Sequence, residues 1–226
     1  MIKVMSSLAV KAAYLELAPQ FEKAAGEKIE TQWVGMVDIR KRIAAGDVTD
    51  LVIGSAALID ELIKAGKLAA GSRADLGKSG VTAAVRKGAP KPDIGSVEAL
   101  KRTLLGAKSI LYSAGPSGVY LAELFKRLGI DDKLKATAKQ TPPGVLVGEL
   151  IAKGEAELGF QQLPELLAVK GIDIVGPLPA EVQQMTTFSV GLHAQAPSAA
   201  AAKKWLNFLA STRGSAVLRR HGVEPA

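Results

Sequence analysis

Two hydroxyl groups stand directly after a predicted strand near the start of the chain. Ile2–Met5 has the apolar character of a short buried strand, and Ser6 and Ser7 follow it before a predicted helix over Ala9–Ala25. The N-terminus of a helix presents unpaired N–H groups and the positive end of the helix dipole. Hydroxyls at this place can therefore help to bind a small anion. They can also serve as ordinary N-caps, and the two roles are compatible.

A strand, a glycine turn, a helix and a second strand are predicted along Thr31–Ser55. The helical pattern begins at Asp38 and places Arg40 in the first turn, where the helix dipole opposes a cation. A guanidinium aimed at the carboxylate of a ligand explains this choice, and a solvated charge is the alternative. Met36 lies in the turn, where it forms either an apolar wall of a site or plain core filling.

A comparable segment occurs over Leu111–Leu128. The loop Ser113–Gly118 follows a predicted strand and leads into a predicted helix over Val119–Leu128. Ser113 and Ser117 supply hydroxyls, and Gly118 supplies flexible backbone at the start of the helix. This arrangement suits contact with a ligand, and a plain turn is the alternative.

Two glutamines follow the predicted strand Ala156–Phe160 at its carboxyl end. Ligands of open α/β sheets bind at this edge. Consecutive residues of a strand face opposite ways, so we expect at most one of Gln161 and Gln162 to line a site. A further helix is predicted over Gly144–Lys153.

Strands and helices alternate with short turns, which implies a parallel doubly wound sheet. The passage Gly71–Gly80 is polar, rich in glycine and without periodicity. The strands Val81–Val85 and Thr186–Leu192 flank a self-contained α/β unit. The simplest organisation therefore has one lobe from residues 1–82 plus 188–226 and a second lobe, residues 83–187, inserted into it. Two crossings between lobes permit hinge closure around a ligand.

Composition bounds the possible partners. The 226 residues are 48% hydrophobic and 23% charged, which suits one large domain or two lobes of about 100 residues each. Aromatic residues make up only 4% and no reader motif is present, so we expect no nucleic-acid partner. The net charge of +7 reflects either general solubility or a positive field that draws small anions into a cleft.

Several kinds of chemistry are excluded or disfavoured. The chain has no cysteine, so disulfides, thiolate nucleophiles and zinc–thiolate sites are impossible. His193 and His221 lack neighbouring ligand spacing, and we expect surface or structural roles for both, with no metal and no cofactor. Nucleophile-elbow, Walker A and His-Glu-x-x-His motifs are absent.

No apolar run approaches the roughly 20 residues that span a bilayer. No signal peptide precedes the strand that begins at residue 2, so we expect a mature domain with an added start methionine.

The order and spacing of several segments resemble the molybdate-binding branch of the bacterial type II periplasmic substrate-binding proteins, over essentially the whole chain. These segments are Ser7-Leu8, Leu17-Ala-Pro-Gln-Phe-Glu-Lys-Ala, Lys41–Gly46 before Asp50-Leu-Val-Ile-Gly-Ser, Pro116–Tyr120, Gly154-Glu155 before Leu158-Gly159, and the tail Ala201–Leu209. The resemblance implies two α/β lobes, each a mixed or parallel sheet flanked by helices, with a ligand cleft between them. It also implies a periplasmic monomer that binds a small anion and delivers it to the membrane subunits of an ABC transporter.

In that family, hydroxyls and backbone N–H groups from loops of both lobes hold the ligand oxygens. Ser7 stands where the family has its first-loop serine, whereas the position of the paired second-loop serines falls on Met36. The loop of the second lobe matches Ser113–Gly118, a helix-start contact falls near Gly144, and a position often held by tyrosine falls on Gln162. Methionine and glutamine make a larger and less symmetric cage than a tetrahedral oxyanion needs. We therefore expect an organic anion, a carboxylate, rather than molybdate or tungstate.

This altered pattern also resembles the periplasmic aconitate isomerase group, through Gly159-Phe-Gln-Gln and Gly176-Pro-Leu-Pro. Two hypotheses follow. The first is a solute-binding protein that captures a small organic anion with helix N-termini, serines and a glutamine. The second is an isomerase that moves a proton along a short unsaturated tricarboxylate. An isomerase needs a base, and Asp38 and Glu165 are the nearest carboxylates by sequence.

Overall fold

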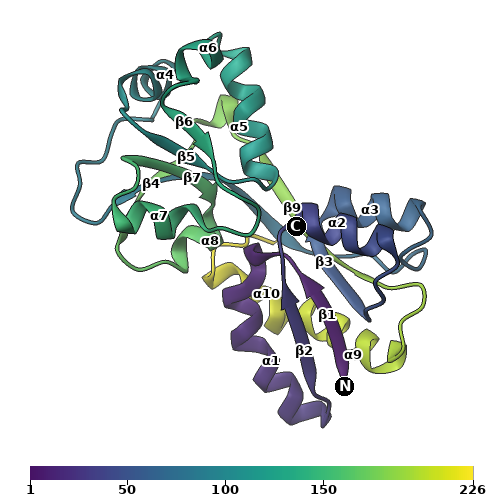
Figure 1. The fold of residues 1–226 in the computed structure, drawn as a ribbon. Coiled ribbons are helices and arrows are strands. Elements are labelled where there is room, and N and C mark those ends of the chain that lie inside the picture. Colours follow the sequence, from purple (N-terminus) through teal and green to yellow (C-terminus); the bar gives the residue numbers. More distant parts are fainter. Residues whose placement is uncertain (226) are drawn as a thin grey trace. The chain divides into compact units, whose positions relative to one another are not determined.

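The computed structural model describes residues 1–225 (Figure 1). The described residues divide into two compact units, of which the first comprises residues 1–79 with 186–225 and the second comprises Gly80–Met185. Strand β4 (Ala74–Arg86) and strand β9 (Met185–Leu192) each run across the boundary between the units.

Three parallel strands form the centre of the first unit: β1 (Ile2–Ser6), β2 (Ile29–Trp33) and β3 (Leu51–Ser55). The order is β2-β1-β3-β9, and β9 is antiparallel to β3. Ser6 lies opposite both Trp33 and Ile53, so the three parallel strands end at the same edge of the sheet.

Helices cover both faces of this sheet. One face packs against α1 (Lys11–Ala25), α9 (Ala199–Leu209) and α10 (Thr212–Arg220), with Trp205 fully buried among them. The other face packs against α2 (Met36–Ala45) and α3 (Ala56–Lys64). Neighbouring residues of a strand face opposite sides of the sheet. In β3, Val52 packs on the face covered by α2 and α3, and Ile53 packs on the face covered by α1, α9 and α10. This explains the continuous apolar run in β3.

Glycines end helices α1 and α2. Gly26 follows α1 with φ 67°, and Gly46 follows α2 with φ 104°. Both adopt the left-handed conformation that glycine takes without steric cost.

The second unit contains β5 (Ile110–Tyr112), β6 (Ala138–Gln140), β7 (Leu158–Gln162) and β8 (Ile172–Pro177) beside the second half of β4. β5 is parallel to β6 and β7, whereas β4 is antiparallel to β7 and β8. Tyr112 lies opposite both Gln140 and Phe160, so β5, β6 and β7 also end at one common edge.

Helices again lie on two sides of the sheet. α4 (Val97–Gly106), α5 (Pro116–Arg127) and α6 (Asp131–Leu134) contribute to the larger core with Phe160 and Ile110. α7 (Val147–Lys153) forms a smaller cluster that includes Leu111. The short α8 (Leu163–Leu167) follows β7 directly, and a 3₁₀ turn lies at Ala180–Val182.

The structure corrects several sequence-based predictions. The sheets are mixed, as the family resemblance allows, because β4 and β9 run antiparallel to their neighbours; the parallel sheet that the alternating pattern alone implies is corrected in this respect. The passage Gly71–Gly80 is largely strand, since β4 begins at Ala74 and buries Leu76 in the core of the first unit. The short elements α6 and β6 are additions that the pattern did not predict.

Helix starts also differ. α2 begins at Met36 rather than Asp38, and α5 begins at Pro116 rather than Val119. α7 begins at Val147, so Gly144, predicted as the first helical residue, lies in the preceding turn with φ 78°.

Candidate functional site

Helix starts gather at the carboxyl edge of the sheet in the first unit. Ser7 is the N-cap of the 3₁₀ helix Leu8–Val10, Gly35 of α2 and Ser55 of α3. Because β1, β2 and β3 end together, these three N-caps lie at one edge, where N–H groups and helix dipoles favour a negative charge.

Ser6 and Ser7 are both buried at this edge, with 0% and 3% of their surface exposed. The Ser6 hydroxyl donates to the carbonyl oxygen of Ser7 over 3.0 Å, and the Ser7 N–H donates to the carbonyl oxygen of Ile53 over 2.9 Å. The Ser7 hydroxyl is a buried polar atom with no hydrogen-bond partner among the described residues. Buried polar groups are almost always paired, so this hydroxyl is a candidate ligand contact.

Met36 and Arg40 lie on α2. Met36 is the first residue of the helix and packs partly buried against the apolar clusters on both sides of the sheet, as core filling does. Arg40 is the fifth residue of α2 and lies beyond the first turn, which corrects its predicted position. Its guanidinium binds both carboxylate oxygens of Glu61 on α3, at 2.9 and 3.0 Å. In the structure, the guanidinium of Arg40, which was predicted to bind a carboxylate of the ligand, is therefore paired with the carboxylate of Glu61.

The second unit repeats the pattern at the carboxyl edge of its own sheet. Ser113, Thr141 and Gln161 lie at or just beyond the common end of β5, β6 and β7, and all three are buried. The sequence carries no signal that places Thr141 at this edge, because β6 is only three residues long and too short to show a periodic pattern.

Ser113, Ser117 and Gly118 form one compact turn. The hydroxyl oxygens of Ser113 and Ser117 lie 2.8 Å apart, and the N–H of Gly115 donates to the Ser113 hydroxyl over 3.2 Å. A Cβ atom on Gly118 would lie 1.5 Å from the Ser113 carbonyl oxygen, so glycine is required there. The turn therefore presents two fixed hydroxyls at the N-terminus of α5.

Gln161 bridges two elements at this edge. Its side-chain oxygen accepts a hydrogen bond of 2.8 Å from the N–H of Val147, the first residue of α7. Its amide also bonds the carboxyl group of Glu165, which in addition accepts a hydrogen bond from the backbone N–H of Gln162. Gln162 is buried and is the N-cap of α8. The side chain of Gln161 is therefore hydrogen-bonded to two neighbours within the chain, the N–H of Val147 and the carboxyl group of Glu165. The backbone N–H of Gln162 bonds the same carboxyl group.

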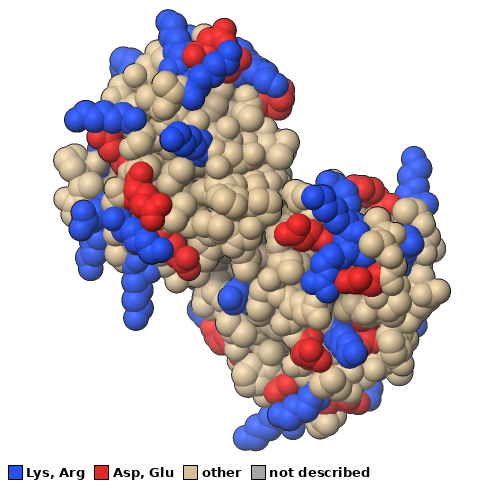
Figure 2. Space-filling model, viewed as in Figure 1, with Lys and Arg blue, Asp and Glu red and all other residues tan. Residues whose placement is uncertain are grey.

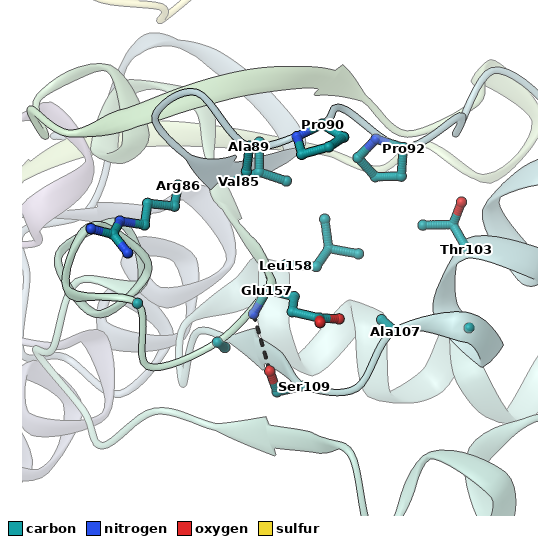
Figure 3. A pocket seen from close by; sticks show the side chains of 13 residues that line it. Val85, Arg86, Ala89, Pro90, Pro92, Thr103, Ala107, Ser109, Glu157 and Leu158 are labelled. Atoms are coloured by element: carbon teal, nitrogen blue, oxygen red, sulfur yellow. Dashed lines mark hydrogen bonds between the residues drawn. The ribbon is translucent and has the colours of Figure 1, made fainter.

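A separate cavity of about 570 Å³ lies in the second unit (Figure 3). It opens at the start of β7 and the end of β4, the edge opposite Ser113 and Gln161. Its walls are mainly apolar, and none of the predicted site residues lines it. Glu157 donates its N–H to the Ser109 hydroxyl over 3.0 Å at its floor. Because this edge lies opposite Ser113 and Gln161, substitutions here can serve as controls for substitutions in the candidate site.

The two histidines have neighbours of their own. The ring of His193 accepts a hydrogen bond from the N–H of Gln195, and that of His221 pairs with Glu16 at 2.9 Å. Burial is the main reason why the pKa of His193 is lowered. Residues 1–225 contain no cluster of three His, Asp or Glu side chains placed to hold a metal ion.

Charge is dispersed on the face shown in Figure 2. Lysines and arginines alternate there with aspartates and glutamates over both units. This face therefore shows no single basic surface. No helix in the described part of the chain has the length and apolar character needed to cross a membrane.

Comparisons with known proteins agree with this architecture. The sequence model of the family described as bacterial extracellular solute-binding protein matches residues 2–224. The aconitate isomerase of a Pseudomonas species is 40% identical over 230 residues, which cover 99% of this chain and 87% of that protein.

Solved structures show the same fold. The periplasmic molybdate-binding protein of Azotobacter vinelandii superposes with a TM-score of 0.84 at 18% identity, covering 100% of both chains. The sulfate-binding protein SubI of Mycobacterium tuberculosis superposes with a TM-score of 0.79 at 20% identity, covering 100% of this chain and 86% of that one. The predicted type II periplasmic-binding-protein fold with mixed sheets is therefore confirmed.

Proposed function

The chain belongs to the bacterial extracellular solute-binding protein family, and from this premise we propose that it binds aconitate, a small unsaturated tricarboxylate, and interconverts the cis and trans isomers. The observation that carries the proposal is the 40% identity to an aconitate isomerase over 99% of the chain. The molybdate-binding and sulfate-binding proteins described above are 18% and 20% identical and support the fold only.

Candidate ligand contacts lie at the carboxyl edge of the sheet in each unit. In the first unit, Ser7 offers a buried hydroxyl without a partner among the described residues. In the second unit, the hydroxyls of Ser113 and Ser117 are hydrogen-bonded to each other at a helix N-terminus, and one of the two O–H groups stays available to a ligand. Hydroxyls and backbone N–H groups at helix starts suit carboxylate oxygens. Met36 stands where molybdate binders usually show serines, which supports an organic anion over a tetrahedral oxyanion.

The proposed reaction is a proton shift. A proton leaves the methylene carbon of aconitate, and the remaining electron pair is delocalised over the carbon skeleton and its carboxylate groups. A proton returning to the former alkene carbon moves the double bond and exchanges the isomers. Helix N-termini favour this step, because their N–H groups stabilise the negative charge that develops on the carboxylate oxygens.

A second candidate function is supported by the family itself. A solute-binding protein of the periplasm would capture the same carboxylate as a monomer and deliver it to the membrane subunits of an ABC transporter. Both functions require the same binding site, and they differ only in turnover.

Thermal unfolding with added anions tests the ligand class. We expect cis- or trans-aconitate to raise the melting temperature, whereas molybdate and sulfate at the same concentration have little effect, because a ligand stabilises the folded state that binds it. A larger shift with molybdate than with aconitate would refute the carboxylate preference. Binding of aconitate without interconversion would favour the transport function.

A further inference from the structure

A polar network lies at the carboxyl end of β7, where Gln161 and Gln162 are buried and Glu165 is partly exposed. Glu165 is the third residue of α8, and its carboxyl group accepts hydrogen bonds from the side-chain amide of Gln161 and from the backbone N–H of Gln162. Gln161 is held from its other side, since its oxygen accepts the 2.8 Å hydrogen bond from Val147. The carboxyl group is therefore fixed in position by two donors.

The network belongs to the same edge as the serine pair. β5 and β7 are adjacent and parallel, so the loop that begins with Ser113 and the segment that leads to Glu165 leave the sheet side by side. A carboxylate has about four lone-pair sites, of which the two donors use two. Glu165 thus keeps the capacity to accept a proton.

The environment of Glu165 suits proton transfer near neutral pH. Desolvation by the surrounding protein raises the pKa of Glu165 to about 7, and the two hydrogen bonds oppose this rise only in part. The other shifted carboxyl groups of residues 1–225 move in the opposite direction. These are Glu16, Glu22, Asp75 and Asp132.

Charged side chains do not account for the behaviour of Glu165. The elements packed against α8 are β7, α7 and β8. α7 carries Glu149 and Lys153, and β8 carries Asp173. None of these three acts on Glu165, whose pKa is set by desolvation and by the two glutamine donors.

We propose that Glu165 is the base that moves the proton between the two carbon atoms of bound aconitate, an inference that rests on the proposed function. The carboxylate takes a proton from the methylene carbon, so that a C–H bond breaks and an O–H bond forms. The same O–H group then gives its proton to the former alkene carbon, and the double bond forms at the other position. Glu165 returns to its starting state, and no further reactant is needed.

The contacts of Glu165 also match a capping box, in which a glutamate at the third helical position bonds the N–H of the N-cap residue. That structural role does not depend on ionisation near pH 7, whereas a base must be deprotonated. A pH profile therefore separates the two roles.

The test compares the full-length protein with Glu165→Gln and with Glu157→Gln. Glutamine keeps an oxygen that can accept the N–H of Gln162, but it cannot take up a proton. Glu157 is an exposed glutamate just before the start of β7, at the opposite edge, and serves as the matched control. Interconversion of trans-aconitate is followed by NMR, and binding is measured by calorimetry.

We expect Glu165→Gln to lower kcat about 100-fold or more, the range of general-base catalysis. Its dissociation constant for aconitate should change by less than about threefold. Glu157→Gln should have the same kcat and dissociation constant as the unaltered protein. The kcat of the unaltered protein should rise as the pH increases through about 7. Any residual activity of Glu165→Gln should lack this rise.

Two results would overturn the assignment of Glu165 as the base and leave the proposed function intact. The first is a kcat of Glu165→Gln within about fivefold of that of the unaltered protein, and the second is a pH profile that the substitution leaves unchanged. Absence of turnover by the unaltered protein would overturn both. If Glu165→Gln does not fold, Glu165→Asp replaces it. The displaced aspartate should still show the rise in kcat with pH but at a lower rate, and an unchanged rate would overturn the assignment.

Discussion

The hydroxyl oxygens of Ser113 and Ser117 lie 2.8 Å apart across the start of α5. The short separation exists because the loop folds back onto the helix, with the Ser113 carbonyl oxygen against the backbone of Gly118. One O–H group is used in the bond between the two oxygens, and the other can donate to an anion with little loss of side-chain entropy, because its position is already fixed.

Gly118→Ala should destabilise the protein strongly. The added methyl group would lie 1.5 Å from the Ser113 carbonyl oxygen, which is backbone and cannot move aside. We expect a loss of about 3 kcal/mol in the free energy of unfolding, measured by denaturant titration. Gly106→Ala is the control, because no atom lies within 4 Å of its added Cβ and alanine favours the helix. Equal stability of the two variants would contradict this packing.

Ser7→Ala should separate stability from binding. The buried hydroxyl of Ser7 has no partner among the described residues, so its removal costs no hydrogen bond, and stability should stay the same or rise slightly. Binding of aconitate, measured by calorimetry, should weaken roughly 10-fold or more, because a hydrogen bond to a charged group is lost.

Ser109→Ala is the matched control for Ser7→Ala. Its hydroxyl accepts the N–H of Glu157 at the opposite edge of the second sheet, so we expect a loss of about 1 kcal/mol in stability and unchanged binding. Unaltered binding by Ser7→Ala would remove Ser7 from the proposed ligand contacts.

Gln183→Ala should destabilise the start of the second unit. The amide of Gln183 accepts the N–H of Val81 over 2.9 Å and donates to the carbonyl oxygen of Val81 over 3.0 Å, in the manner of a neighbouring strand. Loss of both bonds should lower the free energy of unfolding by about 2 kcal/mol. Gln184→Ala, at the exposed neighbouring position, should have little effect. Identical melting curves for the two variants would argue against this pairing.

The raised pKa of Glu165 predicts a pH dependence of stability. Its pKa is about 7 in the folded protein and near 4.5 when unperturbed, so the folded state binds the proton more tightly. The stabilising effect is complete below about pH 4.5 and is lost as the pH rises through 7.

Glu165→Gln stays neutral and should lack this loss. The difference in the free energy of unfolding between the two proteins should therefore change by at most about 3 kcal/mol between pH 4.5 and 7.5, with the unaltered protein losing stability. Denaturant titrations across this range provide the measurement. A difference that is independent of pH would contradict the raised pKa.

Local sequence patterns predicted much of the fold. Ser7 and Ser117 were placed at strand ends and helix starts because strand, turn and helix signals lie within a few residues of each other. Gly26 directly follows the helix predicted over Ala9–Ala25 and ends α1 in the structure, because the left-handed residue at a helix end is a local requirement. Such features depend on neighbours in the sequence, and the structure confirms them.

Features fixed by distant residues were not predictable in this way. α7 begins at Val147 because the side chain of Gln161, 14 residues away in sequence, accepts its N–H. Arg40 carries no signal that identifies Glu61 as its partner. Desolvation of Glu165, which raises its pKa, depends on the packing of α8 and cannot be read from the sequence alone.

Incubation of the purified protein with pure cis-aconitate and, separately, with pure trans-aconitate tests the central claim most directly. The account predicts that NMR spectra of both samples converge on one equilibrium mixture, at a rate proportional to protein concentration. Two spectra that stay distinct and unchanged, under conditions where calorimetry shows aconitate bound, would contradict it.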